Sequence, residues 1–168
     1  QADSDNMTDV IAALATLLDV NTASAAGKLS AFYAKWKEDP QVLDKWFTLQ
    51  ALSSAPDTVE KVAELLGHPD FNLQTPNRVR SLVGVFAMAN LAQFHRADGA
   101  GYKLLGSQIA KIDPLNPQLA SRLVVPMLRW KRYDEKRQAM MKAELEVLVA
   151  MDGVSKDLSE QVNKSLKA

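Results

Sequence analysis

Helix start and stop signals divide this chain into short segments, and they limit its fold more than any other feature of the sequence. Asp39-Pro40, Thr75-Pro76 and Asn116-Pro117 each place a capping residue before a proline, which is favoured at the first position of a helix. Gly67 is typical of a helix end. Between these signals apolar residues recur at helical spacing, and no segment alternates with period two for long enough to form a strand. The sequence therefore predicts an all-α protein.

The apolar stripes predict a series of short amphipathic helices. They cover roughly residues 7–18, 22–37, 40–49, 59–66, 76–86, 102–112, a segment from 117 past 126, 134–150 and 155–166, with a short helical turn at 92–95. We expect Asp5 or Asn6 to cap the first helix, Asp134 to cap the eighth and Ser155 to begin the last. Pro126 removes a backbone donor inside the seventh helix, so it is expected to kink that helix.

About eight or nine short helices with short connections are typical of a helical-repeat stack. We expect a right-handed superhelix, that is, an α-solenoid of HEAT- or armadillo-like antiparallel helix pairs. A closed helical bundle is the alternative, because no internal sequence repeat is visible. At 168 residues the chain is long enough to bury a core, so residues 1–168 are expected to form a single all-helical domain.

The charge of the chain gives no general attraction for anionic partners. Its 20 basic and 20 acidic residues cancel, so neither nucleic acid nor an anionic membrane surface is an expected partner. One basic run, Arg129, Lys131 and Arg132, is soon followed by Asp134 and Glu135. No apolar run approaches the roughly 20 residues that span a bilayer, and no signal segment opens the chain. We therefore expect a cytoplasmic protein without membrane contact.

The residues that could carry out chemistry are isolated from one another. The chain has no cysteine, and neither His68 nor His95 has a second histidine at the spacing that puts two ligands on one helix face. Gly99 and Gly101 are not followed by the lysine and serine or threonine of a phosphate-binding loop. No serine lies in the strained turn of a serine nucleophile. The sequence therefore predicts no catalytic residue, no metal ligand and no cofactor within this chain.

Two arginines, Arg80 and Arg122, are the candidate site residues. Arg122 lies among apolar residues on the predicted inward side of its helix, and Arg80 lies beside a strip of small residues that includes Gly84. A guanidinium buried without a partner costs roughly several kcal/mol, so each must be paired or must face a wet cavity. An internal ion pair with a residue such as Glu64 or Asp113 is one interpretation. The other is an anion-binding or carboxylate-facing cavity wall.

Strings along nearly the whole chain resemble one protein family. The strings are Asn6-Met7-Thr8-Asp9, Asp44-Lys45-Trp46-Phe47 with Leu49-Gln50, Pro76-Asn77-Arg78-Val79-Arg80-Ser81-Leu82, Phe94-His95, Asp98-Gly99, Gly101-Tyr102, Asn116-Pro117-Gln118, Ala120-Ser121-Arg122-Leu123, Lys131-Arg132-Tyr133-Asp134 and Lys136-Arg137. In this order they resemble the C-terminal all-helical domain of bacterial aminopeptidase N, the zinc-dependent alanyl aminopeptidase family. The resemblance corresponds to roughly the second half of that domain.

The resemblance implies a role in a larger enzyme. In that family the C-terminal domain is a superhelical cap that closes over the catalytic domain and walls an internal substrate chamber. This chain would then be the non-catalytic C-terminal portion of a zinc metallo-aminopeptidase that removes N-terminal amino acids from peptides, with Arg80 and Arg122 facing the chamber. The implied partners are the catalytic and N-terminal domains of the same polypeptide, and peptide substrates in the chamber.

The catalytic motifs of that family are absent from this sequence. They are His-Glu-x-x-His with a downstream glutamate for zinc, Gly-x-Met-Glu-Asn for the substrate amine, and a tyrosine that stabilises the tetrahedral intermediate. The resemblance therefore implies zinc only in the catalytic domain of the parent enzyme, and we expect this chain alone to be inactive. The alternative function is that of a free-standing helical-repeat adaptor, which would bind a partner peptide or helix in its concave face.

Overall fold

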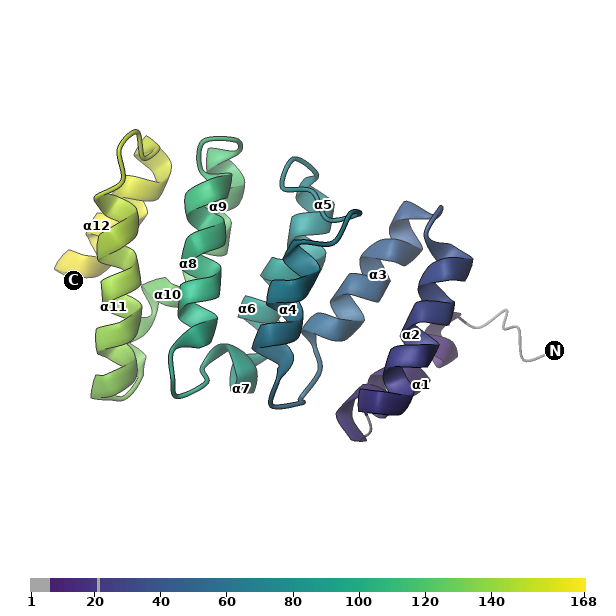
Figure 1. The fold of residues 1–168 in the computed structure, drawn as a ribbon. Coiled ribbons are helices and arrows are strands. Elements are labelled where there is room, and N and C mark those ends of the chain that lie inside the picture. Colours follow the sequence, from purple (N-terminus) through teal and green to yellow (C-terminus); the bar gives the residue numbers. More distant parts are fainter. Residues whose placement is uncertain (1–6, 21) are drawn as a thin grey trace.

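Antiparallel helices stack in two layers along this chain. The structure is a computed structural model and describes residues 7–20 and 22–168, so the expected caps of the first helix, Asp5 or Asn6, lie outside the described part. One layer contains α2 (Thr22–Trp36), α4 (Thr58–Leu66), α8 (Ala100–Ile112) and α11 (Glu135–Val149). The other contains α1 (Met7–Val20), α3 (Pro40–Ala51), α5 (Pro76–Val79), η1 (Arg80–Gly84), α6 (Val85–Ala89), α9 (Pro117–Leu123), α10 (Val125–Leu128) and α12 (Lys156–Lys167). Figure 1 shows α4, α8 and α11 side by side in front of α5, α9 and α12.

Contacts between the elements join neighbours along the stack. In one layer α1 contacts α3, α3 contacts η1, and α9 contacts α12, while in the other α4 contacts α8 and α8 contacts α11. The short α7 (Leu91–Phe94) and the 3-10 helix η2 (Trp130–Arg132) lie in connections. The described residues contain helices, turns and loops but no strand, so the prediction of an all-α fold is confirmed. None of the described helices is both long enough and apolar enough to cross a membrane.

Several helices start at the capping residues that the sequence predicts. The carboxylate of Asp39 accepts hydrogen bonds from backbone N–H groups at the start of α3, and the side chain of Asn116 does the same for α9. Asp134 caps α11 and Ser155 caps α12 in the same way. Each cap satisfies a backbone donor that has no partner inside its helix, so these four starts are fixed by local chemistry.

Two of the predicted helices depart from regular α-helical geometry. The seventh is broken at Val124 into α9 and α10, close to Pro126, which cannot continue the hydrogen-bond ladder. The expected kink is therefore confirmed. In the fifth, α5, η1 and α6 run on into one another, and η1 is a π-helical turn in which the N–H of Val85 donates to the carbonyl of Arg80. Widened turns of this kind are frequent at functional sites.

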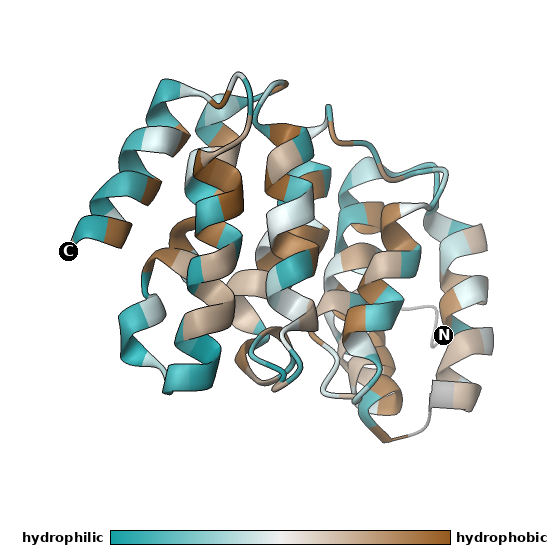
Figure 2. Ribbon diagram, turned by 60° about the vertical axis from the view of Figure 1, so that its left-hand side comes forward, coloured by the Kyte–Doolittle hydropathy of each residue, from teal (hydrophilic) through white to brown (hydrophobic). Residues whose placement is uncertain are grey.

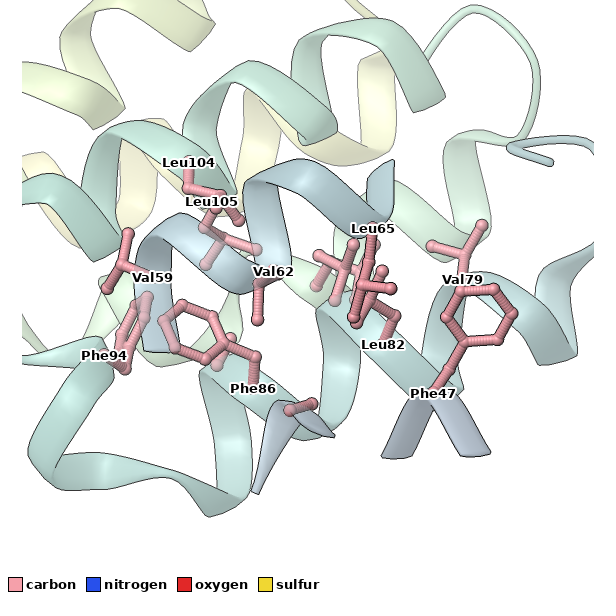
Figure 3. Packing of buried hydrophobic residues seen from close by; sticks show 14 of the residues in the cluster. Phe47, Val59, Val62, Leu65, Val79, Leu82, Phe86, Phe94, Leu104 and Leu105 are labelled. Atoms are coloured by element: carbon pink, nitrogen blue, oxygen red, sulfur yellow. The ribbon is translucent and has the colours of Figure 1, made fainter. Parts of the chain in front are cut away.

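A hydrophobic core fills the space between the two layers. Figure 3 shows Phe47 of α3, Val62 of α4, Leu82 of η1, Phe94 of α7 and Leu105 of α8 packed in one region, and all of them are fully buried. The same cluster of buried side chains extends into α1 at one end and α12 at the other. Each helix pair therefore buries its apolar stripe against the next pair, as expected of a helical-repeat stack.

Candidate functional site

Arg80 and Arg122 line the same surface groove. The groove has a volume of about 350 Å³ and lies between the η1–α6 segment and α9. Its other lining residues are apolar or small: Gly84, Val85, Met88, Ala89, Leu119 and Leu123. The structure therefore brings the two arginines that the sequence singles out into one groove, Arg80 from η1 and Arg122 from α9.

Gly84 lies at the floor of the groove, beside Leu123 of α9. A Cβ atom at this position would lie 3.6 Å from the side chain of Leu123, an ordinary van der Waals distance. The π-helical turn η1 begins at Arg80 and ends at Gly84, and both residues line the groove. The widened turn therefore forms one side of the groove.

Both arginine side chains are exposed, which corrects the prediction that Arg122 lies on the inward side of its helix. The inward positions of α9 are occupied by Leu119, Ala120 and Leu123, each at most 1% exposed. The prediction assumed that one regular helix continues past Pro126. Because α9 ends at Leu123, the apolar residues that follow do not extend the stripe around Arg122.

The internal ion pair that the sequence suggests for these arginines does not form. Among the described residues, neither Arg80 nor Arg122 makes an ion pair. The suggested partners are engaged elsewhere: Asp113, which is 1% exposed, accepts hydrogen bonds from Ser155, and Glu64 lies in a surface ion pair within α4. The described residues therefore show neither of the suggested ion pairs, and the anion-facing wall stays a prediction.

The groove is lined by two positive charges, while Asp157 and Glu160 line a neighbouring groove that also includes Arg122. Arg80 donates from Nη1 to the amide oxygen of Asn77 at 3.3 Å, a neutral partner that leaves the charge of the guanidinium in place. No carboxylate lines the groove among the described residues. A guanidinium offers several N–H donors in a planar fork that matches a carboxylate. The arrangement can therefore bind an anion over an apolar floor.

A third arginine, Arg78, is the buried one, and the sequence analysis did not single it out. It is 9% exposed, its Nε donates to the carboxylate of Asp44, and its Nη1 donates to the carbonyl of Asp70. Its guanidinium carbon lies 5.3 Å from the ring centroid of Phe47. These contacts fasten α5 to α3, so Arg78 has a structural role.

His95 is part of an aromatic cluster. Its Nδ1 lies 2.7 Å from the hydroxyl of Tyr102, and its ring stacks on Tyr133 with centroids 4.2 Å apart. Burial lowers the pKa of His95, and the nearby Arg137 lowers it further. Burial raises the pKa of Tyr102 to about 12. Both groups are therefore neutral near pH 7, and the cluster is suited to holding α7, α8 and α11 together rather than to proton transfer.

His68 also has a structural position. Its Nδ1 accepts a hydrogen bond from the N–H of Asp70 at 3.0 Å, and its ring packs against Tyr33, Trp46 and Phe47. The part of the chain that the structure describes contains no group of three or more histidine, cysteine, aspartate or glutamate side chains that could hold a metal ion.

A second basic groove was missed by the sequence analysis. It has a volume of about 500 Å³, lies between the α10–η2 segment and α12, and is lined by Arg129, Lys131, Arg132 and Lys164. In the sequence, Asp134 and Glu135 soon follow the basic run. In the structure Asp134 caps α11 and pairs with Arg137 of the same helix, at an Oδ1–Nη1 distance of 3.0 Å.

Comparison with known families decides the classification. A family model described as a domain of unknown function, DUF3458_C, with ARM repeats matches residues 1–167. The chain belongs to this family. The ARM-repeat description of DUF3458_C agrees with the stacked helix pairs, so the prediction of an α-solenoid with armadillo-like pairs is confirmed.

The relatives of this DUF3458_C chain are aminopeptidases. Over 164 residues it is 43% identical to aminopeptidase N of Escherichia coli (strain K12) and 42% identical to aminopeptidase N of Haemophilus influenzae, covering 98% of this chain and 19% of each relative. The crystal structure of Legionella pneumophila aminopeptidase A in complex with aspartic acid matches with a TM-score of 0.92 and 37% identity, over 97% of this chain and 19% of that chain. The predicted resemblance to the C-terminal domain of aminopeptidase N is confirmed.

Proposed function

We propose that this DUF3458_C domain is the non-catalytic C-terminal portion of an aminopeptidase that removes N-terminal residues from peptides. In the proposal it corresponds to roughly the second half of the C-terminal domain, covers the catalytic domain and forms part of the wall of the substrate chamber. The similarity to aminopeptidases over 98% of this chain but 19% of the relatives supports a role beside other domains of one polypeptide. Location in the cytoplasm belongs to the same proposal.

Zinc in this proposal is bound by the catalytic domain of the parent enzyme. A zinc site needs three or four protein ligands, and the described residues of this chain offer no such group. The residues that the structure describes therefore do not fit the metal. Their proposed contribution is to bind and orient the peptide and to exclude large folded substrates.

The groove of Arg80 and Arg122 is the observation that carries the proposal. Two exposed guanidinium groups without an acidic partner lie over an apolar floor. The C-terminal carboxylate of a peptide fits the donors, and the neighbouring apolar side chain fits the floor. We therefore assign the groove to the carboxylate end of peptide substrates.

The test is a comparison of free and amidated peptides with the full-length aminopeptidase that contains this domain. The double variant Arg80→Gln/Arg122→Gln is expected to lower kcat/KM about tenfold for peptides with a free C-terminal carboxylate, because it removes charge-assisted hydrogen bonds. The C-terminally amidated peptides are expected to be unaffected. The matched control, Lys28→Gln/Lys111→Gln, removes two exposed charges from α2 and α8. Unchanged kinetics of the arginine variant for peptides of every length would overturn the carboxylate role.

A second test uses this chain by itself. We expect no turnover of an alanine chromogenic amide and no stoichiometric bound zinc on the same sample. Turnover that a chelator abolishes, together with bound zinc, would contradict the assignment of catalysis to another domain.

A further inference from the structure

Four grooves lie on the layer that contains η1–α6, α9–α10 and α12. Together they form one face of this layer. Met88 lines both the groove of Arg80 and Arg122 and a second groove that reaches Arg129. Arg129 also lines the groove beside α12, and Gln161 is shared between that groove and a fourth one. The fourth groove returns to Arg122. The grooves therefore form a closed ring through shared lining residues.

This face has an excess of positive charge. We call it the basic face and define it by its basic lining residues: Arg80, Arg122, Arg129, Lys131, Arg132 and Lys164. None of them forms an ion pair with a described residue. The acidic side chains that line the same ring are Asp157 and Glu160, and Glu160 already lies 3.8 Å from Lys156. In Figure 2 α12, the helix that ends at C, is mostly hydrophilic, with its apolar residues turned toward the neighbouring helices.

Hydrogen bonds join the two walls of the groove beside α12. Trp130 donates from Nε1 to Ser165 Oγ at 3.2 Å, and Ser165 donates from Oγ to the carbonyl of Leu128 at 2.8 Å. The ammonium of Lys131 lies 5.4 Å from the Trp130 ring centroid. These bonds join η2 to α12, which are the two walls of the groove. The segments that carry the basic side chains are therefore joined to each other beside the groove.

Apolar side chains separate the basic groups. Met88 and Leu91 line the central groove of the ring, and they are 49% and 59% exposed. A regular polyanion would leave these apolar surfaces uncovered, whereas an extended peptide presents carboxylates and apolar side chains on the same face when acidic and apolar residues alternate in pairs along it. The mixture of positive charge and apolar surface therefore fits a peptide with acidic residues better than a nucleic acid.

We propose that the basic face binds acidic peptide segments, with the carboxylates of aspartate and glutamate side chains at Arg129, Arg132 and Lys164. This inference deepens the proposed function and rests on it. The peptide segment would be the part of a substrate that lies downstream of the residue to be removed. The basis of the inference is charge complementarity and the continuity of the basic face with the groove of Arg80 and Arg122.

Direct binding to this chain tests the proposal without any catalytic step. The probe is a fluorescein-labelled peptide in which pairs of glutamates alternate with pairs of leucines, so that each face of the extended chain carries both, and its binding is followed by fluorescence anisotropy at low ionic strength. A peptide with glutamine in place of glutamate is expected to bind at least about tenfold more weakly, and binding of the glutamate peptide is expected to weaken as salt is added. The variant Arg129→Gln/Arg132→Gln/Lys164→Gln should weaken binding of the glutamate peptide about tenfold.

A matched variant separates the basic face from net charge. Lys28→Gln/Lys111→Gln/Lys136→Gln removes the same number of charges from exposed positions on α2, α8 and α11, and binding is expected to stay within about twofold of the unchanged chain. Circular dichroism of both variants checks that the helices persist.

Three outcomes would overturn the proposal. The first is an equal loss of peptide binding in both triple variants. The second is binding of the glutamine peptide as tight as that of the glutamate peptide. The third is binding of a DNA duplex that is as tight as that of the glutamate peptide and that is lost in the variant Arg129→Gln/Arg132→Gln/Lys164→Gln. Because this experiment measures binding alone, its failure is distinct from failure of the proposed function, which would appear in the kinetics of free and amidated peptides.

Discussion

The buried carboxylate of Asp113 accepts two hydrogen bonds from Ser155, one from the backbone N–H at 2.7 Å and one from the side-chain hydroxyl. Asp113 follows the last residue of α8, and Ser155 is the N-cap of α12, where its Oγ also accepts from the N–H of Leu158 at 3.3 Å. The end of one helix therefore fixes the start of another. Because α12 forms one wall of the basic face, this contact also positions the proposed binding surface.

Removing the carboxylate should destabilise the domain. Asp113→Ala is expected to lower the free energy of unfolding by about 2 to 3 kcal/mol, because it leaves the donors of Ser155 without their partner in a buried place. Urea denaturation followed by circular dichroism measures the change. Asp152→Ala removes an exposed carboxylate near the same turn and is expected to change stability by less than about 0.5 kcal/mol. Equal effects of the two variants would show that the contact adds nothing.

Two glycines should respond in opposite directions to alanine. A Cβ at Gly101 would lie 2.2 Å from the carbonyl oxygen of Phe94, a backbone atom, so Gly101→Ala is expected to cost more than about 2 kcal/mol. Gly27 lies inside α2 and a Cβ there meets nothing within 4 Å. Gly27→Ala is therefore expected to raise stability by about 0.5 to 1 kcal/mol. Thermal denaturation of both variants gives the comparison, and a loss of stability at both positions would contradict it.

Arg78 should matter for folding in a way that Arg80 does not. Arg78→Ala is expected to cost about 3 kcal/mol, because it leaves the carboxylate of Asp44 and the carbonyl of Asp70 without their donor. Arg78→Lys should restore only part of this, since an ammonium cannot reproduce the planar fork of the guanidinium. Arg80→Ala is the control and is expected to stay within about 0.5 kcal/mol of the original chain. Urea midpoints of the three variants decide between these outcomes.

Local signals in the sequence predicted most of the fold but not the long-range polar contacts. Asn116 and Ser155 act as caps because the bonds they make reach only a few residues ahead. Asp44, the carboxylate partner of Arg78, lies 34 residues away in the sequence, and no spacing rule connects the two. Periodicity predicted an inward Arg122 because it assumed a helix that continues past Pro126.

The basic face was missed for a similar reason. In the sequence, Asp134 soon follows Arg129, Lys131 and Arg132. An acidic residue at a helix N-cap is committed to its own helix, and Asp134 bonds to the N–H and the guanidinium of Arg137. Charge runs next to a helix start therefore have to be counted without the capping residue.

His95 should make the stability of the domain depend on pH. Its pKa in the folded chain lies below the ordinary value of 6.5, first because of burial and then because of Arg137. The unfolded chain therefore takes up a proton at a higher pH than the folded chain does. Stability is fully present above about pH 6.5 and is expected to decrease as the pH falls through the window between the unfolded and folded pKa values. Urea unfolding at intervals from about pH 8 to pH 5 measures this slope.

The variant His95→Gln separates this effect from the acidic residues. It loses the bond to Tyr102, so the domain should be less stable at every pH, but the slope between about pH 6.5 and the folded pKa should flatten. The hydrogen bonds from Arg96 lower the pKa of Asp98 from 3.8 to about 2, and the stability that this carboxylate contributes is lost as the pH falls between these two values. The two windows are therefore distinct. A slope near pH 6 that survives in His95→Gln would assign the pH dependence to another group.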